Sequence, residues 1–180
     1  KKKEFLTIIQ KKIDHLTLIV DLLYELSQID SSDKELTMNQ QFLEQIVVET
    51  MLMFYDDFEK KQLNIHLDES VVAPILADKK ATVRIVTNII QNALTYAQSY
   101  LTISLIEEKE YIRLRAVNDV EEINTTELQR IFDRTFRLDH SRTGPQLGLG
   151  LHIVQQLINK QGGEVMADVH EKEFIIEVSF

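Results

Sequence analysis

Two glycines ahead of an apolar segment supply the first candidate binding chemistry in this chain. Residues 144–163 have the sequence GPQLGLGLHIVQQLINKQGG, in which Gly148 and Gly150 flank Leu149. Glycine lets the backbone approach a ligand closely. The first amide N–H groups of a helix have no partners within that helix, which suits them to phosphate. A tight turn is the ordinary alternative for such a pair. The glycines alone therefore leave both a phosphate site and a turn open.

Two asparagines upstream supply the second candidate. Asn88 and Asn92 occur in RIVTNIIQNALTYA, residues 84–97, and their spacing of four places both on one face of a helix. Asparagine is unfavourable inside a helix because its side chain competes for backbone hydrogen bonds, so both side chains need partners. An amide oxygen can ligate Mg²⁺, which in proteins often binds substrate phosphates as well. Capping of neighbouring loops is the alternative.

The elements that must position these residues follow from hydropathy patterns. Helices are predicted at 42–61, around the two asparagines, and after Gly148 and Gly150 as far as Lys160, with Gly162 and Gly163 ending the last one. Strands are predicted at 63–67, 100–106 and 111–117, a short apolar connection at 71–76 and a polar, mobile lid at 124–147. In the first helix we expect Met51, Met53 and Phe54 to be core residues.

Taken together, three segments resemble the motifs of sensor histidine kinases. NIIQNA (88–93) is similar to the N box, IFDRTFRLDHSR (131–142) to the phenylalanine box of the ATP lid, and GLGLHIV (148–154) to the second glycine box. Their order and distances also fit, and residues 162–180 resemble the closing strands of that domain. The resemblance implies the Bergerat-type ATPase fold. This is an α/β two-layer sandwich with a mixed sheet, helices on one face, and nucleotide between helices and lid.

The first glycine box of that family, Asp-x-Gly-x-Gly, is eroded here. The apolar–basic alternation of the preceding strand places Asn118 where the family has the aspartate that accepts a hydrogen bond from the adenine amino group. Val120 and Glu122 then stand at the glycine positions, and Ile123 fits the hydrophobic residue that closes the box. A shift by one residue would put Asp119 in the aspartate's place but breaks the strand phase. We therefore prefer Asn118.

A neutral amide at this position predicts weakened nucleotide binding rather than none. A hydrogen bond to a charged partner contributes about 1.5–3 kcal/mol, against about 0.5–1.5 kcal/mol for a neutral one. The difference of about 1 kcal/mol corresponds to about fivefold in affinity. The missing glycines should also stiffen the start of the lid.

The resemblance implies a set of residues around ATP and Mg²⁺, the two cofactors expected here. The ATP-binding residues are Asn88, Asn92, Tyr96, Asn118, Ile123, Arg137, Gly148, Leu149, Gly150 and Leu151. Asn92 is also the expected Mg²⁺ ligand. Arg134, Arg137 and Arg142 in the lid either offset phosphate charge or form a solvated face. The family often has a lysine three residues after the second asparagine, where this chain has Thr95, so one phosphate contact is removed.

The N-terminal segment carries a separate pattern. Leu6, Ile9, Ile13, Leu16, Val20 and Leu23 are spaced alternately three and four residues apart, as in the a and d positions of a heptad. The run FLTIIQKKIDHLTLIVDLLYELSQID resembles the second helix of the kinase dimerisation and phosphotransfer hairpin, which implies a homodimer through this helix. In that family the phosphoacceptor histidine lies on the first helix. His15 is therefore not expected to be phosphorylated, and no catalytic residue is assigned within the chain. We expect residues 1–30 to be this helix, 31–35 a linker and 36–180 the ATP-binding domain.

Composition excludes several other classes of protein. The 180 residues are 44% hydrophobic, enough for one packed domain with a helical appendage. The net charge of −9 argues against a nucleic-acid partner, and the absence of cysteine excludes disulfides and thiolate metal sites. No apolar run reaches the roughly 18 residues of a membrane-spanning helix, and no signal peptide is visible. The resemblance implies a cytoplasmic region of a protein that upstream segments anchor in the cell membrane.

These observations predict the catalytic region of a sensor histidine kinase. The reaction implied by the resemblance is transfer of the ATP γ-phosphoryl group to a histidine on an upstream helix absent here, followed by relay to an aspartate of a response regulator. Two alternatives stay open. The eroded glycine box favours a degenerate pseudo-kinase that dimerises or docks a regulator. The fold alone also permits another ATPase, such as an anti-sigma-type serine kinase, although the heptad helix argues against it.

Overall fold

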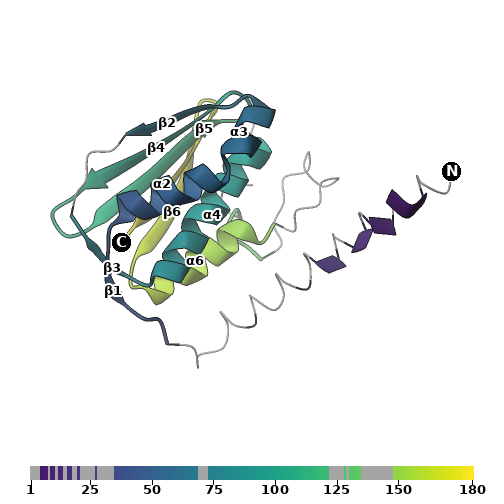
Figure 1. Ribbon diagram of the computed structural model, residues 1–180. Coiled ribbons are helices and arrows are strands. Elements are labelled where there is room, and N and C mark those ends of the chain that lie inside the picture. Colours follow the sequence, from purple (N-terminus) through teal and green to yellow (C-terminus); the bar gives the residue numbers. More distant parts are fainter. Residues whose placement is uncertain are drawn as a thin grey trace.

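The computed structural model describes residues 35–68, 73–121, 130–134 and 148–180, with Leu128 and, in the N-terminal segment, residues 5–7, 9, 10, 12, 13, 16, 17, 20 and 27. The helices of the domain are α2 (Leu43–Met53), α3 (Tyr55–Lys61), α4 (Lys79–Tyr96) and α6 (Gly150–Lys160). The strands are β1 (Asn39–Gln41), β2 (Asn64–Asp68), β3 (Ile75–Ala77), β4 (Tyr100–Glu107), β5 (Ile112–Asp119), β6 (Glu164–His170) and β7 (Glu173–Ser179) (Figure 1).

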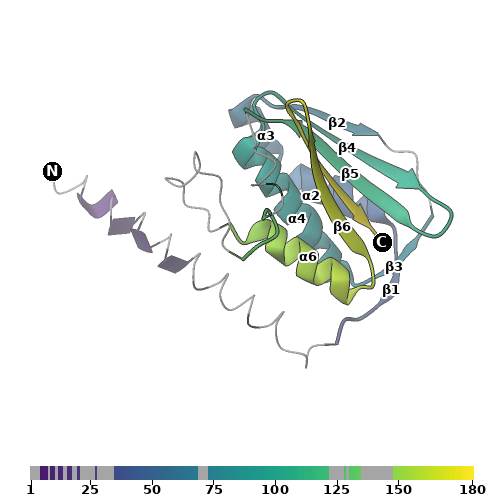
Figure 2. The same ribbon diagram turned by 180° about the vertical axis from the view of Figure 1, so that it is seen from behind.

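Five of the strands form one mixed sheet in the order β2-β4-β5-β7-β6. β2 runs parallel to β4, and the other neighbouring pairs are antiparallel. Figures 1 and 2 show α2, α4 and α6 lying together across one face of this sheet, with no helix of the described domain on the other. The expected α/β two-layer sandwich, with helices on one face of a mixed sheet, is confirmed.

The hydrophobic core lies between the sheet and these helices. Buried and half-buried residues alternate along β4, β5 and β7, as period-two side-chain placement requires. The buried set faces the helices, where Ile85, Ile90 and Ile153 are fully enclosed. Burial of a side chain of this size contributes about 1.5–3 kcal/mol. The core therefore holds α4 and α6, the two helices with the candidate motifs, in fixed positions.

A separate two-stranded sheet connects the start of the domain to α4. β1 pairs antiparallel with β3, and Asn39 lies opposite Ala77. The expectation that residues 71–76 form only a connection is wrong for Ile75 and Leu76, which belong to β3. A strand of three residues is too short to show alternation, and its partner strand is distant in sequence, so no local pattern indicated the pairing.

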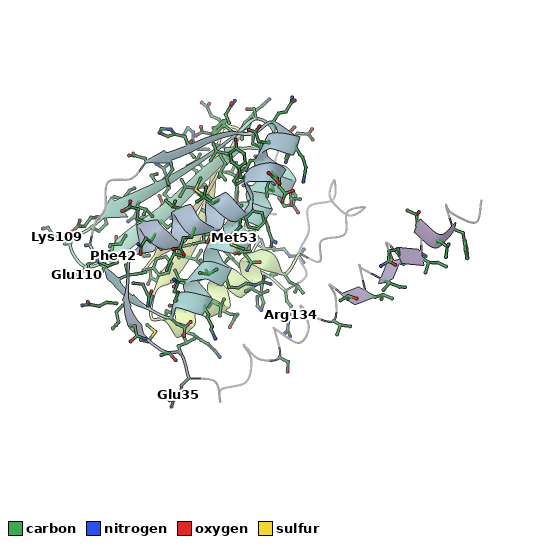
Figure 3. All side chains as sticks on the ribbon, viewed as in Figure 1. Glu35, Phe42, Met53, Lys109, Glu110 and Arg134 are labelled. Carbon is green, nitrogen blue, oxygen red and sulfur yellow. The ribbon has the colours of Figure 1, made fainter. Side chains whose placement is uncertain are left out.

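The helix predicted at residues 42–61 is two helices that meet at Phe54. The buried residues of α2 are Leu43, Ile46, Val47 and Thr50. Met53 was expected in the core but is 72% exposed and lies at the far end of α2 from Phe42 (Figure 3). Met51 and Phe54 are half-buried and pack against the core. Apolar residues occur on several faces of α2, so their spacing alone did not identify the face that packs.

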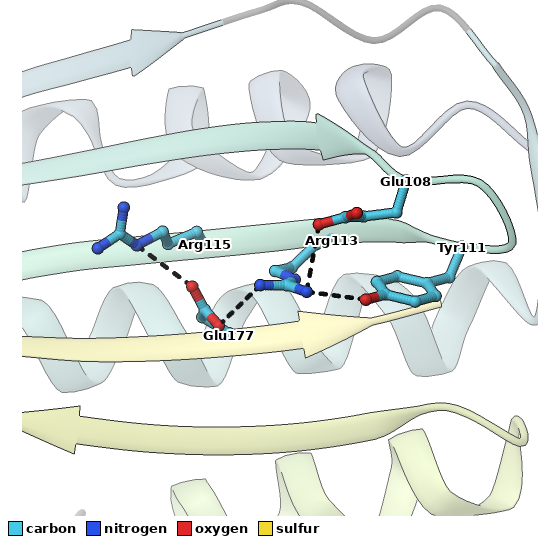
Figure 4. Close-up of polar contacts among 5 residues, drawn as sticks. All are labelled: Glu108, Tyr111, Arg113, Arg115 and Glu177. Atoms are coloured by element: carbon cyan, nitrogen blue, oxygen red, sulfur yellow. Dashed lines mark hydrogen bonds and ion pairs between the residues drawn. The ribbon is translucent and has the colours of Figure 1, made fainter.

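The open face of the sheet is bridged by charged side chains. Arg113 and Arg115 of β5 pair with Glu177 of β7 at 3.2 and 3.3 Å. Arg113 also pairs with Glu108 at 3.2 Å and donates to the Tyr111 hydroxyl at 2.8 Å (Figure 4). Solvent screens such pairs, so each contributes about 1 kcal/mol at most. Their effect is to cover this face with polar groups that link two neighbouring strands.

The described residues of the N-terminal segment are helical, and their heptad side chains face solvent. Leu6, Ile9, Ile13, Leu16 and Val20 are all exposed. His15 and Leu23 lie outside the described residues. Within the part of the chain that the structure describes, no helix is long and apolar enough to cross a membrane. The heptad pattern thus presents an apolar stripe, and its assignment to a dimerisation helix stays a prediction.

Candidate functional site

Helix α4 carries the two asparagines of the N-box-like segment. Its first turn is capped by Asp78, whose carboxylate accepts from the Ala81 N–H at 2.9 Å. Asn88 is buried, and its Nδ2 donates to the Arg84 carbonyl at 2.9 Å. Asn92 lies one turn further on and is half-buried. Asn88 therefore satisfies its donor within the helix and keeps its amide oxygen for another contact.

The glycine segment forms the start of α6. Gly148 has φ of +68°, in the left-handed region where only glycine is free of strain. Leu149 follows as the N-cap and is buried, and the helix begins at Gly150, one residue earlier than a helix placed after both glycines. The Ile153 N–H makes a helical bond at 2.9 Å to the Leu149 carbonyl. The amides of the first turn point out of the helix N-terminus, where they suit an anion.

The two motifs meet in space although they are about sixty residues apart in the chain. A Cβ added at Gly150 would lie 3.2 Å from the Asn88 Oδ1 and 3.8 Å from its Cγ. Any larger residue at position 150 would therefore press on Asn88. This close approach is a second role for the glycine, besides freeing the backbone, and it brings amide oxygens and a helix N-terminus together.

Helices α4 and α6 run in opposite directions at this site. The Asp78 N–H at the start of α4 donates to the Gln161 Oε1 at the end of α6, at 2.8 Å. Further along α4, Asn88 faces Gly150 at the start of α6, so Asn92, one turn later, lies beyond the first turn of α6. Oxygen ligands on one helix beside free amides on the other are the donor set that a magnesium-bound phosphate chain requires. The residues present fit that group.

Strand β5 places the two candidates for the adenine contact on opposite faces of the sheet. Asn118 is on the buried face toward the helices, and its Nδ2 donates to the Asp119 carbonyl at 3.0 Å. Asp119 lies on the opposite face. Its carboxylate accepts from the backbone N–H groups of Gln98, Ser99 and Tyr100 and from the Ser99 hydroxyl at 2.6 Å. The strand phase predicted from alternation is confirmed. The hydrogen bonds to Asp119 stabilise the turn between α4 and β4.

The position expected to hold the first glycine of the eroded box is packed. Val120 is buried, and its N–H donates to the Lys172 carbonyl at 2.8 Å. Glu122 and Ile123 lie outside the described residues, as do Arg137 and Arg142. Their assigned roles stay predictions.

The C-terminal end of α4 is capped by a residue of α3 that sequence reasoning missed. The Lys61 Nζ donates to the Leu94 carbonyl at 2.7 Å and caps the helix. Burial lowers the pKa of Lys61, and the nearby Asp119 carboxylate opposes that shift. Thr95 instead turns its hydroxyl back to the Gln91 carbonyl at 2.8 Å. Tyr96 is half-buried and packs against the core in the last turn.

A contact between α6 and the phenylalanine-box segment was also missed. The His152 Nδ1 lies 2.9 Å from the Phe132 carbonyl oxygen. For this histidine, which follows the second glycine box, the sequence left open a position near the ligand and favoured a helix-packing role. Phe132 is half-buried against the core, whereas Arg134 is exposed (Figure 3). The phenylalanine-box segment is thus joined at Phe132 to the first turn of α6.

Comparison with known families decides the class of this domain. Residues 77–180, from the end of β3 to the C-terminus, match the family described as histidine kinase-, DNA gyrase B- and HSP90-like ATPase. The chain belongs to this family. The matched range contains α4, α6, Asn118 and the phenylalanine-box segment, and so covers every residue assigned to the candidate site.

Relatives within the family are sensor kinases. Sensor histidine kinase YcbM of Bacillus subtilis is 26% identical over 90% of this chain and 54% of its own length. Sensor histidine kinase WalK of the same organism is 28% identical over 91% of this chain and 28% of its own length. This chain therefore spans about half, or less, of these relatives. Together with the family match, they support a histidine kinase ATPase catalytic domain.

Solved structures share the fold. The histidine kinase AdeS of Acinetobacter baumannii superposes with a TM-score of 0.79 at 20% identity, over 94% of this chain and 80% of that one. Full-length ShkA in complex with AMPPNP gives 0.83 at 20% identity, over 97% of this chain and 38% of that one. The Bergerat-type fold expected from the motifs is therefore the fold observed.

Proposed function

We propose that this domain binds Mg-ATP between α4 and the N-terminus of α6. The observation that carries the proposal is the approach of Gly150 to Asn88, which would leave 3.2 Å between a Cβ and the amide oxygen. It brings two motifs distant in sequence to one place and pairs oxygen ligands with helix amides. The nucleotide complex of ShkA, a protein of the same fold, supports the choice of ligand.

Each group of site residues has a chemical role in this proposal. Asn92 ligates Mg²⁺ with Asn88 beside it, and the amides from Gly148 to Leu151 hold phosphate oxygens. Asn118 accepts from the adenine amino group, and Tyr96 contacts the base. Ile123 and Arg137 complete the assigned set. Bound Mg²⁺ would supply charge neutralisation for phosphoryl transfer, which depends mainly on positioning and electrostatics.

The activity of the whole protein follows from its relatives as a further proposal. We propose a sensor histidine kinase that transfers the γ-phosphoryl group to a histidine outside these 180 residues and passes it to a response regulator. The exposed heptad stripe from Leu6 to Val20 supports a homodimer through the N-terminal helix. The names of YcbM and WalK as sensor histidine kinases support the class of reaction.

Calorimetric titration with ATP, with and without Mg²⁺, tests the binding proposal. We expect a dissociation constant of tens to hundreds of micromolar, about 4.5–7 kcal/mol of binding free energy, because Asn118 is neutral. Asn92→Ala removes the proposed ligand oxygen and should abolish the Mg²⁺ dependence. Asn159→Ala, at an exposed position near the other end of α6, is the matched control and should bind like the wild type.

The absence of heat and of thermal shift at millimolar nucleotide would replace this proposal with a nucleotide-free module. The buried Val120 at a glycine position is the observation that favours this second candidate. In that case the domain would act by dimerising or by docking a regulator.

A further inference from the structure

The side chain of His152 joins two segments that are twenty residues apart. Its Nδ1 lies 2.9 Å from the Phe132 carbonyl oxygen, which can only accept a hydrogen bond. The Nδ1 must therefore carry the proton and donate. In the neutral ring this leaves Nε2 unprotonated, so the contact selects one tautomer.

The segment on the other side of this bond is a compact turn, here called the Phe132 turn (Leu128 and residues 130–134). The Ile131 N–H donates to the Leu128 carbonyl at 3.2 Å, and the Asp133 N–H donates to the Arg130 carbonyl at 2.8 Å. Ile131 is buried, and Leu128 and Phe132 pack against the core. The Phe132 turn is thus a defined structural unit, and a hydrogen bond to its backbone constrains more than one residue.

The hydrogen bond from His152 to Phe132 begins beside the candidate phosphate site. His152 directly follows the proposed phosphate-binding amides of Gly148 to Leu151 in the first turn of α6, and its side chain reaches the Phe132 turn. Arg134 is two residues beyond Phe132, whose carbonyl accepts this hydrogen bond, and two residues span at most about 7 Å. One residue therefore sets the distance between the helix N-terminus and the nearest described arginine of the phenylalanine-box segment.

We propose that His152 is a positioning residue for the nucleotide. Its Nδ1–H bond to Phe132 holds the Phe132 turn beside the first turn of α6, and this brings Arg134 alongside the phosphate-binding amides. The proposal rests on Mg-ATP binding at this site. It assigns His152 no contact with the reacting atoms.

Two amide substitutions separate the bond from the bulk of the side chain. In His152→Asn the Nδ2 stands close to the position of the imidazole Nδ1, so the donor is kept. In His152→Gln the amide nitrogen lies one bond further out, near the position of Nε2, so the donor to Phe132 is lost. Both side chains are neutral and polar, and glutamine has the higher helix propensity. Loss of helix stability therefore cannot explain a defect confined to the glutamine variant.

The first measurement is the affinity for Mg-ATP by calorimetry. His152→Gln should bind about threefold to tenfold more weakly, the range expected for one lost hydrogen bond, and His152→Asn should bind like the wild type. Wild-type affinity in His152→Gln would overturn the positioning role. Failure of the wild type to bind Mg-ATP would instead overturn the proposed function and this proposal with it.

The second measurement needs no nucleotide. Amide hydrogen exchange at residues 131–133 should quicken in His152→Gln and stay unchanged in His152→Asn, while the core amides of α4 keep their protection in both. Nitrogen NMR of the wild-type ring should find the proton on Nδ1. Equal exchange in both variants, or a proton on Nε2 alone, would show that the hydrogen bond from His152 to Phe132 is absent and overturn the proposal.

Discussion

At the scale of single residues, β5 places two neighbouring polar side chains in opposite environments. Asn118 faces the helices, and Asp119 faces the other side and fastens the turn after α4. Strand geometry alone separates them, because successive side chains point to opposite faces. The proposed adenine contact therefore depends on the phase of the strand and not on which residue has the stronger acceptor.

Asn118→Asp should tighten Mg-ATP binding by about fivefold, since a charged acceptor at the adenine amino group adds about 1 kcal/mol. The same change should lower the unfolding free energy of the nucleotide-free protein by about 1–3 kcal/mol. A buried carboxylate replaces an amide that now donates to the Asp119 carbonyl at 3.0 Å. Calorimetry and denaturant unfolding measure the two effects. Weaker binding in Asn118→Asp, with severe loss in Asp119→Ala, would make Asp119 the adenine contact.

Asp119 makes a contribution to the stability of the domain that depends on pH. Burial raises the pKa of this carboxyl, but the hydrogen bonds from Ser99, Tyr100 and Gln98 outweigh it and hold the pKa below its ordinary value. A carboxyl whose pKa is lower in the folded state stabilises the fold at pH values above its unfolded pKa of about 4. This stabilisation is lost as the pH falls from about 4 through the pKa of the folded state.

Asp119→Asn should accordingly be less stable than the wild type at pH 7, by about 1 kcal/mol because the carboxylate is only half-buried. The difference should shrink as the pH falls below about 4. Denaturant unfolding of both proteins at several pH values between 7 and 3 measures this. A gap that stays constant across the range would contradict the assignment, and nucleotide affinity at pH 7 should be unaffected.

At the scale of elements, Asp78 links α4 to the segment before β1 and to the end of α6. Its Oδ1 caps α4, its Oδ2 accepts from the Thr37 N–H at 2.9 Å, and its own N–H donates to Gln161 at the end of α6. The segment entering the domain is thus tied to the first turn of the helix that carries Asn88 and Asn92. Both helices of the candidate site are fixed at the ends remote from it.

Asp78→Asn should release the entering segment and leave α4 capped. The asparagine oxygen still accepts from the Ala81 N–H, but its nitrogen cannot accept from Thr37. Hydrogen exchange should quicken in β1 and not in the first turn of α4. Asp78→Ala should lose both bonds and cost about 1 kcal/mol more in unfolding free energy. Identical exchange and stability in the two variants would contradict this division of roles.

At the scale of the whole molecule, the N-terminal helix and the domain differ in how they bury apolar surface. The domain encloses its core, whereas the described heptad residues from Leu6 to Val20 stay in solvent, with Leu16 59% exposed. An apolar stripe of this length favours association with a second surface. A second copy of the same stripe is the partner that heptad spacing suits.

Leu16→Glu should therefore shift the chain toward monomer at concentrations where the wild type self-associates, because a charge would be buried at a d position. Analytical ultracentrifugation over a range of concentrations measures the shift. Thr7→Glu, on the same helix but outside the heptad stripe, is the matched control and should associate like the wild type. Equal association of Leu16→Glu and wild type would place the interface elsewhere.

The sequence by itself determined what depends on local spacing. The bounds of α6 to within one residue, the face shared by Asn88 and Asn92, the phase of β5 and the heptad stripe all follow from periods of two, three and a half, or 3.6 residues. The order of three motifs then indicated the family and the two-layer fold. Each of these signals is contained within one element, so no distant partner is needed to detect it.

Only the tertiary structure decided which distant groups meet. The bonds from Lys61 to Leu94, from His152 to Phe132 and from Asp78 to Gln161 join elements through their packing on the sheet. The buried face of α2 and the short β1–β3 pairing were likewise undecided, since apolar residues on several faces, or strands of three residues, specify no unique partner. Helix packing and sheet order fix those contacts, because they set which side chains come within hydrogen-bond reach.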